Sequence, residues 1–229
     1  MRRHLALTYQ ALTRRGQLLP IITLTVLTSL ILQLILEFGP LWLVALAAPI
    51  ILYGPYWAGL MSTFGLGGLL GGRLQLHKPA TLGAVAALMI LASVALTATN
   101  SLVVVTIAQV ILALLIMVAS IHVTRLLHDA VPSTIRAGVS SGAGAISWML
   151  FLPIALAFGL ITTQHGVHTA GWMLTALTAL AATLLTTLSI THHQRPTTAA
   201  DPRLVGSHAA AHLKRPADTA LAAAGLGRQ

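Results

Sequence analysis

Six long apolar runs follow one another along the chain, separated by short polar or glycine-rich segments. Each run has about 20 residues, which is the length an α-helix needs to cross the hydrocarbon core of a bilayer. None of them leaves the polar face that a surface helix of a soluble protein presents to water. The pattern predicts an all-α, polytopic membrane helix bundle with six transmembrane helices, at about 18–38, 50–72, 80–98, 101–125, 137–162 and 170–190.

The two ends of the chain differ from this apolar centre. Residues 1–17 carry four arginines among leucines, which predicts a basic lead-in in the cytoplasm or at the membrane interface. A signal peptide is the alternative, but the apolar run from Leu18 to Leu36 is longer than the usual core of about 7–15 residues, and further spans follow it. Residues 191–229 lack apolar periodicity, which predicts a disordered cytoplasmic tail.

Composition agrees with a lipid environment. Of the 229 residues 56% are hydrophobic and only 7% are charged, whereas a soluble domain has roughly a quarter of its residues charged. The net charge of +9 raises the alternative of a nucleic-acid surface, but the basic residues lie between apolar runs and form no basic face. The absence of cysteine excludes disulfides and thiolate metal sites. We therefore expect the lipid bilayer as a partner, no nucleic acid and no cofactor.

The 13 lysines and arginines fall on alternate connections between the apolar runs. Four lie in the lead-in, two between the second and third runs, two between the fourth and fifth, and five in the tail, while the other three connections have none. Basic residues accumulate on cytoplasmic loops, and a missed or invented span would break this alternation. The distribution predicts an integral plasma (inner) membrane protein with six crossings and both termini in the cytoplasm.

Two of these basic connections carry motifs. The segment Gly68–Lys78 is glycine-rich and basic, with Gly72 directly before Arg73, and the segment Leu126–Ser140 places a proline before Arg136 and a helix of small residues. Together they resemble the equivalent loops in the carboxy-terminal six-helix half of a major facilitator superfamily (MFS) transporter. The first is a degenerate copy, because Gly72 stands where that family has an acidic residue. The resemblance covers about residues 18–190.

MFS transporters have two six-helix halves, and the substrate binds between them near the middle of the membrane. The resemblance implies that this chain is half of an MFS-type fold and belongs to a secondary carrier of a small solute, with proton coupling as one version. It also implies a second six-helix half, or a second copy of the chain, that completes the pathway. The alternative is a non-transporting six-helix membrane protein, either a truncated remnant or an accessory subunit.

Four residues within the spans are candidates for coupling or substrate contact. Glu37 is the only carboxylate in any span, where a charge at the membrane centre costs about 2.5–3.5 kcal/mol on insertion scales. It either couples transport to protons or is an interfacial carboxylate near the outer end of its helix. Gln33 lies one turn earlier on the same face. Gln109 either contacts substrate or makes an interhelical hydrogen bond, and Trp148, five residues before Pro153, faces either a cavity or lipid.

Three charged residues on the cytoplasmic connections are candidates for a gate. Asp129 is the only acidic residue on those connections, so it can pair with Arg73 or Arg136 and latch the cytoplasmic side. An exposed pair contributes only about 0–1 kcal/mol. The latch hypothesis therefore requires a partly buried pair.

Glycines repeat at four-residue spacing in two spans: Gly68 with Gly72, beside Gly67 and Gly71, and Gly138 with Gly142. This spacing lets two helices approach closely, so we expect these pairs to pack against other helices. A separate group of aromatic residues begins the second span, and we expect these rings to mark the membrane interface, with substrate contact as the alternative: Tyr53, Tyr56 and Trp57.

Enzymatic activity is not expected. The segment Gly138–Gly142 has the letters of a serine-nucleophile elbow, but it lies within a predicted helix, and no histidine lies inside the fifth or sixth span. His208 and His212 have the spacing of a metal-ligand pair, but they lie in the predicted tail, and we expect no metal.

Overall fold

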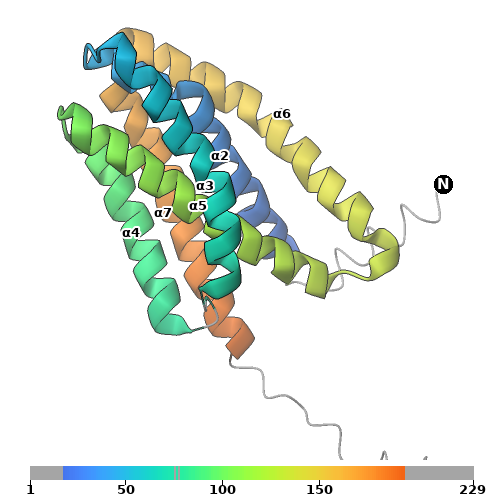
Figure 1. The fold of residues 1–229 in the computed structure, drawn as a ribbon. Helices are drawn as coiled ribbons and strands as arrows, with labels where there is room; N and C mark the ends of the chain where they lie inside the picture. The colour runs from blue at the N-terminus through green and yellow to red at the C-terminus, as the bar shows by residue number, and fades with distance from the viewer. Residues whose placement is uncertain (1–17, 75, 77, 194–229) are drawn as a thin grey trace, which may run out of the picture. The chain divides into compact units, whose positions relative to one another are not determined.

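The computed structural model describes residues 18–74, 76 and 78–193, and every regular element among them is helical (Figure 1). In chain order these are α2 (Leu18–Ala45), η1 (Ile50–Leu52), α3 (Tyr53–Arg73), α4 (Pro79–Ala98), α5 (Leu102–Ala130), α6 (Ser133–His165) and α7 (Val167–His193). The all-α prediction is confirmed. The predicted lead-in lies outside the described residues, as does the predicted tail apart from residues 191–193 at the end of α7.

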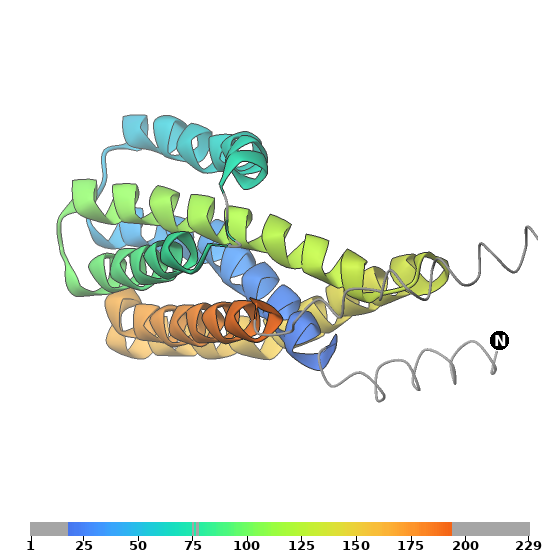
Figure 2. The same ribbon diagram turned by 90° about the horizontal axis from the view of Figure 1, so that it is seen from below.

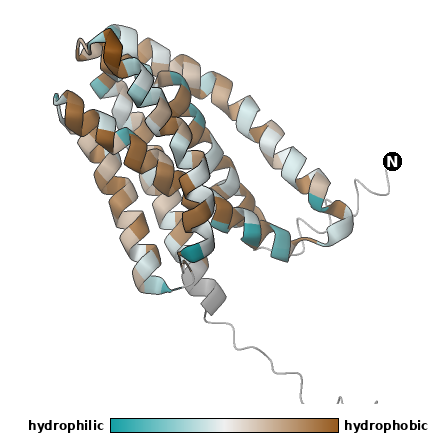
Figure 3. Ribbon diagram, in the orientation of Figure 1, coloured by the Kyte–Doolittle hydropathy of each residue, from teal (hydrophilic) through white to brown (hydrophobic). Residues whose placement is uncertain are grey.

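Among the described residues, five helices are long and apolar enough to cross a membrane: α2, α4, α5, α6 and α7. The prediction of a multi-pass membrane protein is therefore confirmed at this coarser level. In Figure 3 most of the strongly hydrophilic positions lie near helix ends. The remaining predicted span, α3, is not among these five helices. Seven of its 21 residues are glycine and the last is Arg73, so its mean hydropathy is lower than theirs.

Several helices are longer than predicted. α2 continues through Pro40 to Ala45, because a proline removes only one backbone hydrogen bond, and Trp42 and Leu43 beyond it are each only 1% exposed. α5 continues to Ala130 and α6 begins at Ser133. The break between them is at Val131, whose extended backbone is the conformation that a following proline imposes.

Consecutive helices run in opposite directions. All the lysines and arginines of the described residues, namely Arg73, Lys78, Arg125 and Arg136, lie where α3 joins α4 or near the join of α5 and α6; we call this the basic end of the bundle. At the opposite end α6 joins α7 through Gly166 alone. Its φ of 82° is a left-handed conformation that glycine adopts without strain.

The contact between α2 and α5 lies at the centre of the bundle, and each of these two helices packs against two others. α5 packs against α3 and α4. α2 packs against α6, and Trp42 of α2 contacts α7 at Gly171. α7 also meets α4, because the Thr175 hydroxyl donates to the Ser93 carbonyl at 3.2 Å. Figure 2 shows α3 on one side of the α2 and α5 pair and α6 on the other.

The glycines of α3 bring that helix close to α5. A Cβ at Gly67 would lie 2.6 Å from Cγ of Met117, and one at Gly71 would lie 3.2 Å from two side-chain carbons of Ile121. Only a residue without a side chain allows this approach. We expected Gly68 and Gly72 to pack against another helix, but a Cβ at either position would meet no atom within 4 Å. The close contact within this chain is therefore one residue away from the predicted pair, because α5 lies on the face that includes Gly67 and Gly71.

Gly138 and Gly142 also have open space around them in this chain. α6 contacts the other helices along a different stripe, and its buried residues are Val139, Ala143, Ser147, Phe151 and Phe158. The predicted packing of Gly138 and Gly142 finds no counterpart within the described chain. It stays a prediction for a contact with another molecule.

The two neighbouring glycines of α3 provide a matched test of this packing. We expect Gly67→Leu to lower the stability of the purified protein in detergent by about 1–3 kcal/mol or more, because the added side chain overlaps Met117. Gly68→Leu is the control and, in the monomeric chain without a second half, should leave the stability nearly unchanged. Thermal unfolding of both variants measures the difference. Equal losses would contradict the placement of α3 on α5.

Candidate functional site

Four polar side chains follow one another at four-residue spacing along α2: Thr25, Ser29, Gln33 and Glu37. This spacing places them on one face of the helix, which we call the polar face of α2. Glu37 is exposed, and the other three are partly buried. The Thr25 hydroxyl donates to the carbonyl of Ile21, so its polar group is satisfied within the helix. The structure thus places Gln33 and Glu37 on the same face, as the sequence predicted.

Glu37 lies deeper in α2 than the sequence suggested. We expected it near the end of its helix, but α2 continues to Ala45, so about 12 Å of helix follows Glu37 at 1.5 Å per residue. The Oε1 atom of Gln33 is buried without a hydrogen-bond partner in the described part of the chain. Both polar side chains therefore lie well inside the length of α2. Gln33 has a buried oxygen without a partner among the described residues, and the Glu37 side chain is exposed.

A row of aromatic rings joins α2 to α6 beside the polar face. Phe38, the neighbour of Glu37, lies 4.7 Å from Phe158 and 6.5 Å from Phe151 between ring centroids. Trp148 meets Phe151 edge to face at 5.7 Å. Its side chain is 57% exposed. Trp148 therefore points outward from this chain, and the choice between a cavity and lipid stays a prediction.

Gln109 lies in the contact between α2 and α5 and is fully buried. Its Nε2 donates to the carbonyl oxygen of Gly39 at 3.2 Å. Of the two interpretations offered for Gln109, the structure gives the interhelical hydrogen bond. Its Oε1 atom has no partner among the described residues.

Sequence reasoning missed the position of Tyr56. We expected its ring at the membrane interface together with those of Tyr53 and Trp57. Trp57 is 38% exposed, but Tyr56 is only 2% exposed, and its hydroxyl lies against Gly39. The signal was present in the spacing of the buried stripe of α3, which runs through Tyr56, Leu60, Thr63, Gly67 and Gly71.

At the basic end, arginines bind backbone carbonyls at helix ends. Arg125 donates from Nη1 to the carbonyl of Gly71 at 3.0 Å, joining α5 to the end of α3. Arg136 donates from Nη2 to the carbonyls of His128 at 2.8 Å and Val131 at 3.5 Å. These carbonyls lack intrahelical partners, and a cation near a helix carboxyl end is also favourable for the helix dipole.

The ion pair required by the proposed Asp129 latch is not formed among the described residues. Asp129 and Arg73 are both exposed, and among the described residues no ion pair joins Asp129 to Arg73 or Arg136. The guanidinium of Arg136 is instead directed to the end of α5. The latch stays a prediction.

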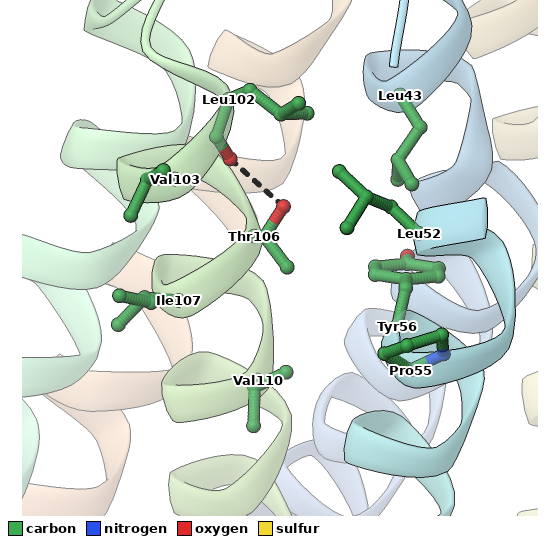
Figure 4. Close-up of a pocket in the computed structure, with 9 residues that line it drawn as sticks. All are labelled: Leu43, Leu52, Pro55, Tyr56, Leu102, Val103, Thr106, Ile107 and Val110. Atoms are coloured by element: carbon green, nitrogen blue, oxygen red, sulfur yellow. Dashed lines mark hydrogen bonds between the residues drawn. The ribbon is translucent and has the colours of Figure 1, made fainter. Parts of the chain in front are cut away.

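Two apolar grooves of about 250 Å³ each lie along α5. One lies between α5 and the start of α3, where Figure 4 shows Thr106, Ile107 and Val110 on one side and Leu52, Pro55 and Tyr56 on the other. The Thr106 hydroxyl donates to the carbonyl of Leu102 at 2.8 Å and offers the groove no free donor. The other groove, between α4 and α5, is lined by aliphatic side chains alone. Such grooves suit lipid chains. Of the residues considered for substrate contact, Tyr56 lines the first groove, and none of the coupling or gate candidates lines either one.

Comparisons with protein-family models, with curated proteins and with solved structures return no match. The class that the fold defines is an all-helical, multi-pass membrane protein.

The roles of Arg136 and Asp129 can be separated by paired substitutions. Arg136→Gln should lower the stability in detergent by about 1–2 kcal/mol, because a charged donor to partly buried carbonyls is removed. Asp129→Asn should change it by less than about 0.5 kcal/mol, as is usual for an exposed, unpaired group. Thermal unfolding provides the readout. Equal losses in the two variants, with no further loss in the double variant, would restore the latch hypothesis.

Proposed function

We propose that this chain is one six-helix half of an MFS-type secondary carrier in the plasma membrane, with both termini in the cytoplasm. A second half or a second copy of the chain completes its pathway for a small solute. The proposal adds α3 to the five long apolar helices, which gives six spans. It also treats the polar face of α2 as part of the pathway. The observation that carries it is the pattern of contacts among the helices.

The main contacts correspond when α2, α3 and α4 are exchanged with α5, α6 and α7. The α2–α5 contact exchanges with itself, and the packing of α3 on α5 matches that of α6 on α2. The packing of α4 on α5 corresponds to the approach of α7 to α2 at Gly171 and Trp42, whereas the smaller contact of α2 with α3 has no such counterpart among the described residues. The α4–α7 contact again exchanges with itself. α2 and α5 run in opposite directions, so the two triplets are inverted repeats. Inverted repeats of three helices are the building units of each half of an MFS carrier.

The length and packing of α3 support its assignment as a span. Its 21 residues extend for about 31 Å at 1.5 Å per residue, close to the thickness of the hydrocarbon core. It runs parallel to α5, a helix long and apolar enough to span, and lies against it through Gly67 and Gly71. Glycine lowers the hydropathy of a helix, but it is common at helix contacts inside membranes.

The outward faces of α3 and α6 support the presence of a second half. α3 and α6 exchange in the symmetry, and each contacts this chain along a single stripe. Their open faces carry large exposed hydrophobic side chains, such as Leu69 and Leu152, together with groups of small residues. The small residues are Gly68 and Gly72 on α3 and Gly138, Ser141 and Gly142 on α6. Small residues let two helices approach closely. We assign these faces to contacts with the second half.

Glu37 is the candidate for coupling. The lysines and arginines of the described residues all lie at the basic end, whereas Glu37 lies in the second half of α2 toward the opposite end. Among the described residues, no lysine or arginine therefore lies near this carboxylate along the chain or at its end of the bundle. An ionisable residue within a membrane span is a candidate for binding a proton or a cationic group on a transport pathway. The proposed solute exchange accordingly involves protons, a cationic solute, or both.

Transport in proteoliposomes tests this proposal. The chain, alone and co-expressed with a candidate second half, is reconstituted with a pH-sensitive dye inside, and small cationic and neutral solutes are added outside. We expect at least one solute to drive a pH change that Glu37→Gln abolishes, because the carboxylate can no longer release its proton. Asp129→Asn, which removes the exposed carboxylate at the basic end, should leave that pH change intact.

Two results would contradict the proposal at different levels. Solute-driven proton movement that persists in Glu37→Gln would remove Glu37 from the coupling mechanism. The absence of any solute movement with every partner would favour the alternative, a non-transporting six-helix membrane protein.

A further inference from the structure

Buried polar groups from three helices meet where α2 passes through Gly39 and Pro40. Gln109 of α5 is 0% exposed and Tyr56 of α3 is 2% exposed. The Gln109 Nε2 reaches the Gly39 carbonyl, and the Tyr56 hydroxyl lies so close to Gly39 that a Cβ at this position would overlap it. The same Cβ position is 3.7 Å from Nε2 of Gln109. The two side chains therefore converge on one backbone position.

Two atoms of this cluster have hydrogen-bonding capacity that no described residue uses: Oε1 of Gln109 and the hydroxyl oxygen of Tyr56. An amide oxygen accepts hydrogen bonds, whereas a phenolic hydroxyl both donates and accepts. Buried polar atoms without partners are rare, and each is a strong reason to look for an ordered water or an ion. Here there are two within one cluster.

The proline next to this cluster adds a further acceptor. Pro40 has no N–H, so the Leu36 carbonyl, four residues earlier, lacks its usual intrahelical donor. Because residue 39 is glycine, the Tyr56 hydroxyl can occupy the position that a Cβ would take, next to the break in α2. The break in the hydrogen bonding of α2 thus coincides with the unpartnered atoms from α3 and α5.

We propose that one water molecule is bound permanently in this cluster. The water accepts a hydrogen bond from the Tyr56 hydroxyl and donates one to Oε1 of Gln109. Its second hydrogen is directed to the Leu36 carbonyl of α2, which Pro40 leaves without a donor. A water fits better than a cation because the Tyr56 hydrogen needs an acceptor, which a cation does not provide. Buried waters usually make about three hydrogen bonds, as this one does.

The bound water connects α2, α3 and α5 at the central contact of the bundle. The described structure has no direct hydrogen bond between the Tyr56 and Gln109 side chains, so the proposed water is the hydrogen-bonded link between them. This inference depends on the packing of the three helices and is independent of transport.

A double-mutant cycle in detergent tests the water. The variants are Tyr56→Phe, Gln109→Met and the double substitution, with Tyr53→Phe as a matched control for loss of a less buried tyrosine hydroxyl. We expect each single substitution in the cluster to lower Tm by about 2–4 °C, because it leaves the remaining polar groups without the water. The double variant should lose no more than the more damaging single one, and Tyr53→Phe should leave Tm unchanged.

A dry cluster gives the opposite result. Removing an unsatisfied hydroxyl would leave Tm unchanged or raise it in Tyr56→Phe, and the effects of the two substitutions would add, which would overturn the proposal. Salts separate water from a cation: Tm in sodium, potassium and choline chloride at equal ionic strength should be the same. A rise specific to sodium or potassium that Gln109→Met abolishes would also overturn the water and identify a monovalent cation site.

Discussion

The contact between α2 and α5 determines the arrangement of every other helix. The two helices are held together by large buried side chains and by the hydrogen bond from Gln109 to the Gly39 carbonyl. α3 and α4 pack on α5, while α6 and α7 pack on α2. A shift along the α2–α5 contact would therefore move one triplet of helices against the other. In a bundle of this kind, the central pair sets the geometry and the outer helices follow.

The absence of water from a bilayer explains where the polar groups of this chain are directed. Thr28, Ser147 and Thr178 donate to carbonyls of their own helices, and the arginines of the basic end bind carbonyls that helix ends leave free. The exceptions among the described residues are single atoms of six side chains: Gln33, Trp42, Tyr56, Gln109, Arg136 and Thr162. Gln33 lies on the polar face of α2, and Gln109 and Tyr56 meet at the central helix contact. These are the two places to which we assign a function or a ligand.

The sequence was sufficient to predict the helices, because hydropathy is a local property and each apolar run forms its own backbone hydrogen bonds. It was not sufficient for the contacts between them. Gly67 and Gly68 differ by one residue, or about 100° around a helix, and only the position of α5 decides which of them packs. The burial of Tyr56 and the continuation of α2 beyond Pro40 depend on the same distant contacts. No sequence motif indicates the correspondence between the two triplets of helices.

The most direct test of the central claim, two inverted repeats of three spans each, is the side of the membrane on which each connection lies. Because the chain has no cysteine, single cysteines can be placed at Ala47, Asn100 and Ser133 and labelled in intact cells with a membrane-impermeant maleimide. If α3 crosses the bilayer, Ala47→Cys and Asn100→Cys react from outside, whereas Ser133→Cys reacts only after permeabilisation. Labelling of Ala47→Cys and Ser133→Cys from the same side, with Asn100→Cys on the other, would show that α3 does not cross and would contradict the inverted repeat.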